Sequence, residues 1–233
     1  MKIAFYGNSL TKGTLGVSYI DKIKSIFPHY EIINFGKNGD TVKSLYERIK
    51  RKEIDISSDI SFLWIGTNDV FKKVSRFYPV HRLFSKQVCS ENHSEFSYYY
   101  KEILYILSSK AKKVVCVPPI FIGEDLKSGW NMELKDLSEI ISDISNSFDN
   151  VTYFNLRDIF ELNLKSKTSS DYIVKSSIRV LFDYFLYNTT KKKNKKSKER
   201  GLFFTIDGAH LNEKGADIVS SYFCKIINDM INP

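Results

Sequence analysis

Strand-like and helix-like segments alternate along the chain, and this alternation limits the possible folds more than any other feature of the sequence. The strand-like segments are short apolar runs, several closed by Gly or Pro, at residues 2–6, 30–35, 60–65, 113–117 and 151–155. Helical patterns fall between and after them, at residues 14–27, 41–50, 95–110, 132–148 and 212–231. Such alternation favours a mostly parallel sheet that is covered by helices on both faces.

Polar, glycine-containing blocks follow directly on the first three predicted strands, at residues 7–11, 36–40 and 66–69. In a parallel sheet the carboxyl ends of the strands meet at one edge, and ligands of open α/β folds bind beyond that edge. We therefore expect these three blocks to lie close together and to form a functional site.

The length of 233 residues suits a single domain, expected to span residues 1–233. Its 42% hydrophobic and 27% charged residues are ordinary for a soluble globular protein. Two regions, at about 71–94 and 161–204, break the alternation and are expected to be elaborations over the sheet edge. Both contain many aromatic residues, which either pack an inserted helix or line a pocket for an acyl group or a sugar. The aromatic residues concerned are Phe71, Phe77, Tyr78, Phe84, Tyr172, Phe182, Tyr184, Phe185 and Tyr187.

The cysteines indicate neither a disulfide framework nor a zinc site. Cys89, Cys116 and Cys224 are odd in number, widely spaced, and form no CxxC pair or Cys/His cluster. No metal or other cofactor is expected. The sequence shows no secretory leader and no run near the roughly 18 apolar residues of a membrane span. The prediction is therefore a cytoplasmic protein.

The positive charge of the chain is concentrated in one segment. Residues Lys191–Arg200 hold seven basic residues and one acidic residue, which is a net +6 of the total +8. The segment has no apolar position to anchor it, so we expect a solvated, poorly ordered loop. The alternative is a patch for anionic lipid, nucleic acid or an anionic substrate. Of these, an anionic surface or substrate is kept as a possible partner, and no nucleic acid is expected.

Two distant residues suggest nucleophilic catalysis. Ser9 stands on a tight turn at the end of the first predicted strand, where a serine is exposed at the sheet edge. His210 has Asp207 three residues before it, which is the arrangement of a base with an orienting carboxylate. The alternatives are a serine that caps the following helix and a structural histidine. The pairing predicts a Ser-His-Asp hydrolase.

Four blocks together resemble the SGNH (GDSL-type) hydrolase family. They are Gly7-Asn8-Ser9-Leu10-Thr11, Asn34 to Thr41, Gly66-Thr67-Asn68-Asp69, and Asp207-Gly208-Ala209-His210-Leu211-Asn212. The resemblance implies a three-layer α/β/α sandwich with a flavodoxin-like, five-stranded parallel sheet in the order 2-1-3-4-5.

The same resemblance implies a role for each matching residue. Ser9 is the nucleophile, His210 the base and Asp207 its orienting carboxylate. The backbone N–H groups of Ser9 and Gly39 and the side-chain amide of Asn68 form the oxyanion hole. Each role is chemically sensible, because a glycine permits close approach of a substrate and an asparagine amide is a donor that does not titrate.

Some residues have lesser expected roles. Asp69 is expected to brace its turn. Asn8 stands where the family usually has an aspartate, and it retains an acceptor for the turn without the charge. The remaining histidines, His29, His81 and His93, are expected to have surface or packing roles.

The resulting functional hypothesis is a serine esterase that hydrolyses a small or medium acyl ester, of an acetylated sugar, a lipid or a similar molecule, through an acyl-enzyme. One alternative is an acyltransferase or thioesterase that uses the same serine, since water and another acceptor compete for one acyl-enzyme. Another is a basic binding module with a vestigial site, against which the intact set of candidate residues argues.

Overall fold

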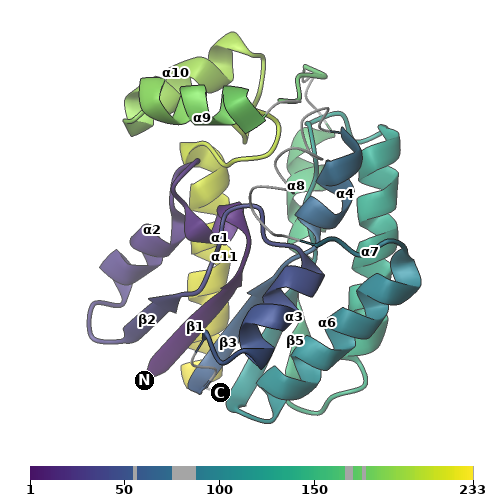
Figure 1. The fold of residues 1–233 in the computed structure, drawn as a ribbon. Helices are drawn as coiled ribbons and strands as arrows, with labels where there is room; N and C mark the ends of the chain where they lie inside the picture. The colour runs from purple at the N-terminus through teal and green to yellow at the C-terminus, as the bar shows by residue number, and fades with distance from the viewer. Residues whose placement is uncertain (55–56, 75–87, 166–169, 175–176, 233) are drawn as a thin grey trace.

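A five-stranded parallel sheet forms the centre of the protein, with the strand order β2-β1-β3-β4-β5 (Figure 1). A computed structural model describes residues 1–54, 57–74, 88–165, 170–174 and 177–232. The strands are β1 (Lys2–Gly7), β2 (Glu31–Asn34), β3 (Ser58–Trp64), β4 (Ala111–Val117) and β5 (Val151–Tyr153). The strands predicted from the sequence, their parallel pairing and their order are therefore confirmed.

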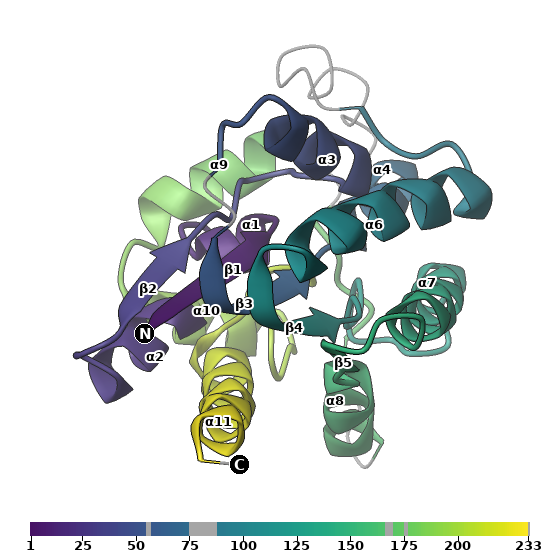
Figure 2. The same cartoon turned by 90° about the horizontal axis from the view of Figure 1, so that it is seen from below.

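Helices cover both faces of this sheet (Figure 2). The face built around Ile3 and Phe5 carries α2 (Tyr19–Ile26), α8 (Leu156–Leu164) and α11 (Glu213–Ile231). The opposite face, built around Ala4 and Tyr6, carries α3 (Val42–Lys50), α6 (His93–Ser108) and α7 (Gly129–Ser145). The three-layer α/β/α arrangement is confirmed.

The strands are apolar on both faces because both faces are covered. Successive residues of β1 alternate between the two hydrophobic clusters, so that Phe5 packs in one and Tyr6 in the other. In β4, Val115 and Cys116 divide in the same way. Near-continuous apolar runs are typical of parallel strands that are buried on both sides.

The remaining helices lie at the carboxyl edge of the sheet, with α9 and α10 at the top of Figure 1 and α1 and α4 below them. They are α1 (Ser9–Lys12) after β1, α4 (Thr67–Val74) after β3, and α9 (Ser177–Leu186) and α10 (Thr190–Glu199) before α11. The sequence predicted none of these four helices as such. They belong to the blocks and elaborations that break the simple alternation, and they surround the expected site.

Local capping explains where several helices begin. Thr41 caps α3 and forms a capping box with Ser44. Asn92 caps α6 and Asn212 caps α11, each through a side-chain oxygen that accepts a backbone N–H of the first turn. Such caps satisfy amide groups that have no partner within the helix.

The lysine-rich segment is ordered, and the sequence-based prediction of a poorly ordered loop was wrong. Residues 190–199 form the helix α10 rather than a poorly ordered loop. Its inner side is anchored by polar groups: the Ser197 hydroxyl donates to the carbonyl oxygen of Thr205 at 2.6 Å, and Asn194 bonds to Glu213 at 2.7 Å. An anchor of this kind needs no apolar residue, so the absence of apolar positions was a poor guide.

The aromatic residues of the elaborations divide into different groups. Phe71 is half-buried against the core, and the guanidinium of Arg200 lies 4.6 Å from the centre of the Tyr172 ring. The aromatic side chains of α9 are exposed instead. Phe77, Tyr78, Phe84 and His81 lie outside the described residues.

Candidate active site

Ser9 is the first residue of α1, directly after β1. The preceding Asn8 caps this helix, and its Oδ1 accepts the backbone N–H of Leu10 at 2.9 Å. Asparagine therefore keeps the acceptor role expected of it at this position. Because Asn8 is 2% exposed and paired, the turn that presents Ser9 is fixed in place.

Asp207 and His210 lie in the loop that leads to α11. Asp207 Oδ1 accepts the backbone N–H groups of Ala209 and His210 at 3.0 and 2.8 Å. Its Oδ2 lies 2.7 Å from Nδ1 of the His210 ring. The carboxylate thus fixes both the backbone turn and the orientation of the imidazole.

The His210 ring joins Asp207 to Ser9, which lies 201 residues away in the chain. Its Nε2 is 3.0 Å from the Ser9 hydroxyl oxygen. With Nδ1–H donating to Asp207, Nε2 accepts the Ser9 hydroxyl proton. All three side chains are buried, which corrects the expectation that Ser9 is exposed at the sheet edge, because His210 and the recess residues pack around it. The structure therefore assembles the three residues that the sequence pairing singled out, at hydrogen-bond distances.

The pKa of Asp207 is held below its usual value. Burial alone raises the pKa of a carboxyl group, and here burial is the largest single influence. The charge of His210 and the hydrogen bonds from His210 and Ala209 together outweigh it. Asp207 is therefore an ionised carboxylate next to the His210 ring.

The loop that carries Gly39 is tied to the Ser9 turn. Lys37 donates its backbone N–H to the carbonyl oxygen of Gly7 at 3.0 Å, and the Asn34 amide donates to that of Thr11 at 2.9 Å. A side chain at Gly36 is excluded, since a Cβ there would lie 2.3 Å from the nitrogen of Lys12. Gly39 itself has a φ of +76°, which glycine adopts without strain.

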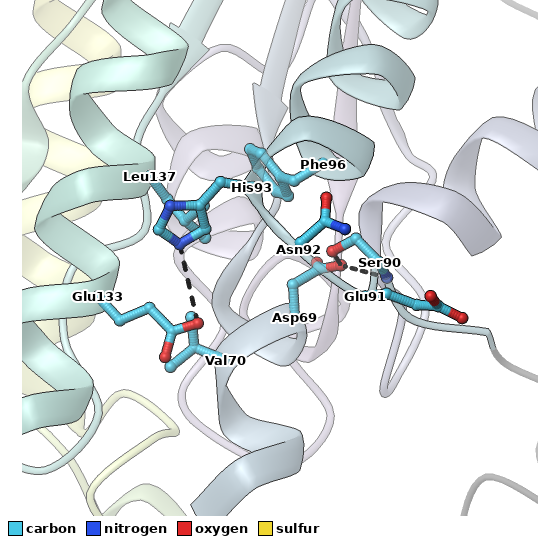
Figure 3. Close-up of a pocket in the computed structure, with 9 residues that line it drawn as sticks. All are labelled: Asp69, Val70, Ser90, Glu91, Asn92, His93, Phe96, Glu133 and Leu137. Carbon is cyan, nitrogen blue, oxygen red and sulfur yellow. Dashed lines mark hydrogen bonds and ion pairs between the residues drawn. The ribbon is translucent and has the colours of Figure 1, made fainter.

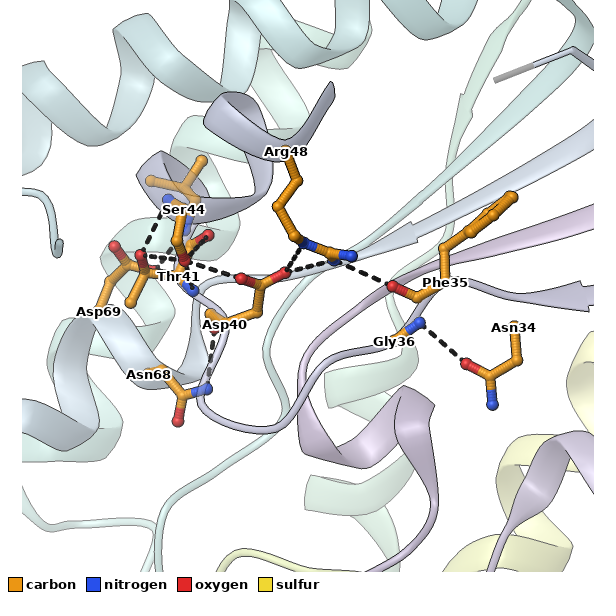
Figure 4. A network of polar contacts seen from close by, with 10 residues as sticks. Asn34, Phe35, Gly36, Asp40, Thr41, Ser44, Arg48, Asn68 and Asp69 are labelled. Carbon is orange, nitrogen blue, oxygen red and sulfur yellow. Dashed lines mark hydrogen bonds and ion pairs between the residues drawn. The ribbon is translucent and has the colours of Figure 1, made fainter. Parts of the chain in front are cut away.

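Asn68 is attached to the same loop. Its side-chain nitrogen donates to the carbonyl oxygen of Asp40 at 2.8 Å (Figure 4). An amide group has two N–H donors, so this bond uses one of them. The structure thus joins two predicted members of the oxyanion hole, since Asp40 directly follows Gly39.

A buried polar network holds this loop from behind (Figure 4). Asp40 is fully buried, and it accepts bonds from Ser44 Oγ at 2.8 Å and from Arg48 Nε at 3.1 Å. Burial raises the pKa of Asp40, and the bonds from Arg48 and Ser44 lower it only in part. Asp69 accepts from the backbone of Val42 and from Ser90, so it braces the start of α3 and the segment before α6 in addition to lying in its own turn.

Glu124 is a positioning residue that sequence reasoning missed. It is 3% exposed, and its carboxylate accepts the backbone N–H groups of Phe203, Phe204 and Thr205 at 2.6–2.9 Å. This fixes the segment just before Asp207. Its partners lie about 80 residues away, so the only available signal was its place soon after the fourth strand.

A separate cavity of about 250 Å³ lies beside α4, α6 and α7 (Figure 3). It contains none of the three residues Ser9, Asp207 and His210. His93 and Glu133 face one another across it, with Nε2 and Oε1 3.9 Å apart. His29 lies in the exposed turn before β2. Neither histidine approaches the Ser9 turn within the described residues.

The described ranges contain no group of three or more His, Cys, Asp or Glu side chains arranged to hold a metal ion. Among the helices described, none combines the length and the apolar character that crossing a bilayer requires.

Several solved structures resemble this chain. The acetyl xylan esterase AlAXEase is 22% identical, with a TM-score of 0.67 over 97% of this chain and 100% of its own. An acetylxylan esterase from Geobacillus stearothermophilus is 16% identical, with a TM-score of 0.64 over 96% and 92%. The α/β hydrolase LAE5, from the metagenome of Lake Arreo in Spain, is 16% identical, with a TM-score of 0.64 over 95% and 92%. At these identities the likeness shows a shared fold.

No match was found among curated proteins. The model of the GDSL-like lipase/acylhydrolase family matches residues 5–218, which include the Ser9 turn, the Gly39 loop, Asn68 and the Asp207–His210 loop. The match spans most of the sequence, and so this chain belongs to the GDSL-like lipase/acylhydrolase family.

Proposed function

We propose that the protein is a serine esterase that hydrolyses esters of small or medium acyl groups through an acyl-enzyme. One observation carries the proposal. The His210 ring contacts both the Ser9 hydroxyl and the Asp207 carboxylate, at 3.0 and 2.7 Å, in a buried site. Activation of a serine requires a hydroxyl, an imidazole and a carboxylate that are joined by hydrogen bonds in this order.

The geometry supports a two-step reaction. In the first step Ser9 Oγ attacks the ester carbonyl carbon while His210 Nε2 takes the hydroxyl proton. The tetrahedral intermediate collapses, the C–O bond to the alcohol breaks, and His210 returns the proton to the departing alcohol. In the second step a water attacks the acyl-enzyme with the same proton transfers, which releases the acid and restores Ser9.

Negative charge that develops on the carbonyl oxygen needs hydrogen-bond donors. The backbone N–H of Ser9 lies in the first turn of α1, where amides have no acceptor within the helix. The Gly39 N–H and the second N–H of Asn68 complete the proposed oxyanion hole. The tie between Asn68 and Asp40 supports this assignment, because it places the amide against the Gly39 loop.

The described residues leave little preformed space beside the nucleophile, and this tight packing gives no support to a long acyl group. The recess there is too tight to hold a water molecule, and it is lined by Leu10, Gly13, Gly16, Val17 and Leu211 together with Ser9 and His210. A Cβ on Gly16 would lie 2.7 Å from the Leu211 carbonyl oxygen, so the backbone at Gly16 packs closely against Leu211.

Structural relatives support an acylated sugar as one substrate class. Two of the similar structures are acetyl xylan esterases. The catalytic mutants solved for the Geobacillus enzyme replace a serine, an aspartate and a histidine. The same three residue types meet at the proposed site here.

The test is covalent labelling with a fluorophosphonate, followed by a panel of p-nitrophenyl esters of increasing chain length. We expect a single label on Ser9, and turnover that is highest for acetate and falls as the acyl chain lengthens. The variant Ser9→Ala is the control and should neither label nor turn over. Labelling of a different residue, or full activity of Ser9→Ala, would exclude the proposed nucleophile.

A further inference from the structure

Helix α9 exposes large apolar side chains to solvent. Among the described residues, five of the thirteen exposed large hydrophobic side chains fall within six consecutive positions of this helix. They are Leu181, Phe182, Tyr184, Phe185 and Leu186, with exposed fractions of 40–67%. Single exposed apolar residues are common on proteins, but a group of this size marks a surface that contacts something.

A buried ion pair keeps the apolar side of α9 facing outward. Asp183 is buried, and its Oδ2 lies 2.6 Å from Nη2 of Arg200, the residue that caps α10. Arg200 is also buried, and its Nη1 donates to the carbonyl oxygen of Ile206 at 2.9 Å. On a helix Leu181 and Phe185 project opposite to Asp183. The usual orientation of an amphipathic helix is therefore reversed here.

Helix α10 presents lysines on its outer side. Its inner side is anchored by Ser197, which bonds to Thr205 and Asn212, and by Asn194, which bonds to Glu213. The exposed residues on the other side include Lys191, Lys192, Lys195 and Lys198. Ordered in this way, the lysines form a fixed cationic face next to the apolar one.

The two helices belong to one surface at the carboxyl edge of the sheet (Figure 1). Besides the bond from Arg200 to Asp183, the Lys196 ammonium lies 5.4 Å from the centre of the Tyr187 ring, which follows α9. At ten residues each, α9 and α10 are too short to span a bilayer. Helices with apolar and lysine-rich faces lie in the plane of a membrane surface instead.

We propose that α9 and α10 form a docking surface for an anionic lipid membrane. The apolar side chains of α9 enter the boundary between headgroups and acyl chains, and the lysines of α10 contact anionic headgroups. Both contributions strengthen the binding, since membrane affinity grows with the apolar area that is buried and with the attraction to anionic lipids.

The charge of this surface favours a membrane over a second copy of the chain. A symmetric dimer brings the same patch of both copies together, so the lysines of α10 would face one another. Nucleic acid fits less well, because phosphates give no reason to expose Leu181, Phe182 and Phe185. An anionic membrane matches both the charge and the apolar side chains.

The docking surface is coupled to the proposed active site through the backbone. The ammonium of Lys193 on α10 donates to the carbonyl oxygen of Gly16. Gly16 lines the recess that contains Ser9 and His210. A membrane bound at α10 therefore lies near the mouth of this recess, where esters at the lipid surface are concentrated.

The test is cosedimentation of the full chain with vesicles of phosphatidylcholine, with or without about one third phosphatidylserine. We expect binding to the anionic vesicles at least about 100-fold stronger than to neutral ones, and weaker binding at about 0.5 M salt than at about 0.1 M. The triple variant Lys191→Ser, Lys192→Ser, Lys195→Ser should lose about 100-fold, at about fivefold for each lysine. The double variant Phe182→Ser, Phe185→Ser should lose binding to both kinds of vesicle.

Matched controls carry the same changes elsewhere. Lys24→Ser, Lys101→Ser, Lys110→Ser removes the same charge from exposed positions, and Ile26→Ser, Tyr105→Ser removes exposed apolar side chains of other helices. Both controls should bind as the wild type does. The proposal is overturned if the controls lose as much as the test variants, if no vesicle binds, or if the Phe182, Phe185 variant instead abolishes a dimer seen by analytical ultracentrifugation. Hydrolysis of a soluble ester stays unchanged in every case, which separates this test from that of the esterase.

Discussion

The active-site corner, which is formed by Ser9, Asp207 and His210, lies at the same edge of the sheet as the docking surface of α9 and α10. The two regions differ in whether polar or apolar side chains are buried. At the corner, Ser9, Asp207 and His210 are polar, buried and paired with one another. On α9 the apolar side chains are exposed, and the buried residue is the charged Asp183. At the active site, hydrogen bonds between the polar side chains allow them to be buried. On α9, the exposed apolar side chains are free to contact the proposed membrane.

The two regions also differ in what their buried charges do. Asp207 acts on His210, which changes its protonation in the proposed reaction. Asp183 pairs with Arg200 and joins α9 to the end of α10. The first pair suits chemistry and the second suits orientation of a helix.

The largest expected effect is loss of turnover at the corner. Ser9→Ala and His210→Ala should each lower kcat for p-nitrophenyl acetate by about 10⁴–10⁶-fold, because the nucleophile and its base act as a unit. The double variant should be little worse than either single one. Steady-state kinetics on the soluble ester make the measurement.

A variant of the docking surface serves as the control in the same assay. The variant Lys191→Ser, Lys192→Ser, Lys195→Ser should keep the wild-type rate on this soluble ester. A loss as large as that of Ser9→Ala would mean that the docking surface and the corner are not separate devices.

The next effect concerns the orientation of α9. Asp183→Ala leaves the charge of Arg200 buried without its carboxylate, which costs about 3–5 kcal/mol in similar pairs. We expect faster hydrogen exchange across residues 177–199, with the sheet core still protected. Replacing both partners, as Asp183→Leu with Arg200→Met, should restore much of the protection.

A partly exposed ion pair on α10 serves as the matched control. Glu199 lies 3.1 Å from Lys196, and about half of the glutamate side chain is exposed. Glu199→Ala should therefore change stability by less than about 1 kcal/mol. Equal effects of Asp183→Ala and Glu199→Ala would show that the buried pair does not hold α9.

The third effect tests the oxyanion hole. Asn68→Ala should lower kcat by about 10²–10³-fold, since one removed donor costs about that much elsewhere. KM should change little. Asp69→Asn is the control, because Asp69 braces Val42 and Ser90. That variant should lower the melting temperature and leave kcat nearly unchanged. If Asn68→Ala also lowers the melting temperature and leaves kcat nearly unchanged, Asn68 is a purely structural residue.

The strands and the candidate residues were predictable because each carries a local pattern. Five apolar runs gave the sheet, and the Ser9 and Asp207–His210 blocks follow recognisable spacings. What could not be predicted depends on distant partners. Glu124 meets backbone amides about 80 residues away, and α10 is fixed by contacts of Ser197 and Asn194 with residues beyond it. No window of sequence contains both halves of such contacts.

The orientation of α9 shows the same limit in another form. Its sequence is strongly apolar, and local pattern suggests a helix packed into an elaboration. The pairing of Asp183 with Arg200, 17 residues apart, turns this helix the other way. Whether the apolar side of an amphipathic helix faces the core or the solvent therefore depends on its tertiary contacts.

The smallest expected effect is a pH dependence of stability at Asp207. The folded-state pKa of Asp207 lies below its value in the unfolded chain. The unfolded state therefore binds more protons than the folded state between these two pKa values, and stability rises with pH there. The contribution of Asp207 is complete above the unfolded pKa of about 3.9, and it is lost as the pH falls through the folded pKa.

Urea unfolding of wild type and Asp207→Asn from about pH 5 to about pH 3 measures this contribution. The difference in unfolding free energy between the two proteins should shrink as the pH falls, because the variant has no carboxylate to protonate. The exposed Asp136 is a control, and Asp136→Asn should leave the acid sensitivity of the wild type in place. If Asp207→Asn is as sensitive to acid as the wild type, the bonds from His210 and Ala209 do not stabilise the ionised carboxylate. The buried charge at the corner would then resemble the pair on α9, with a role in orientation alone.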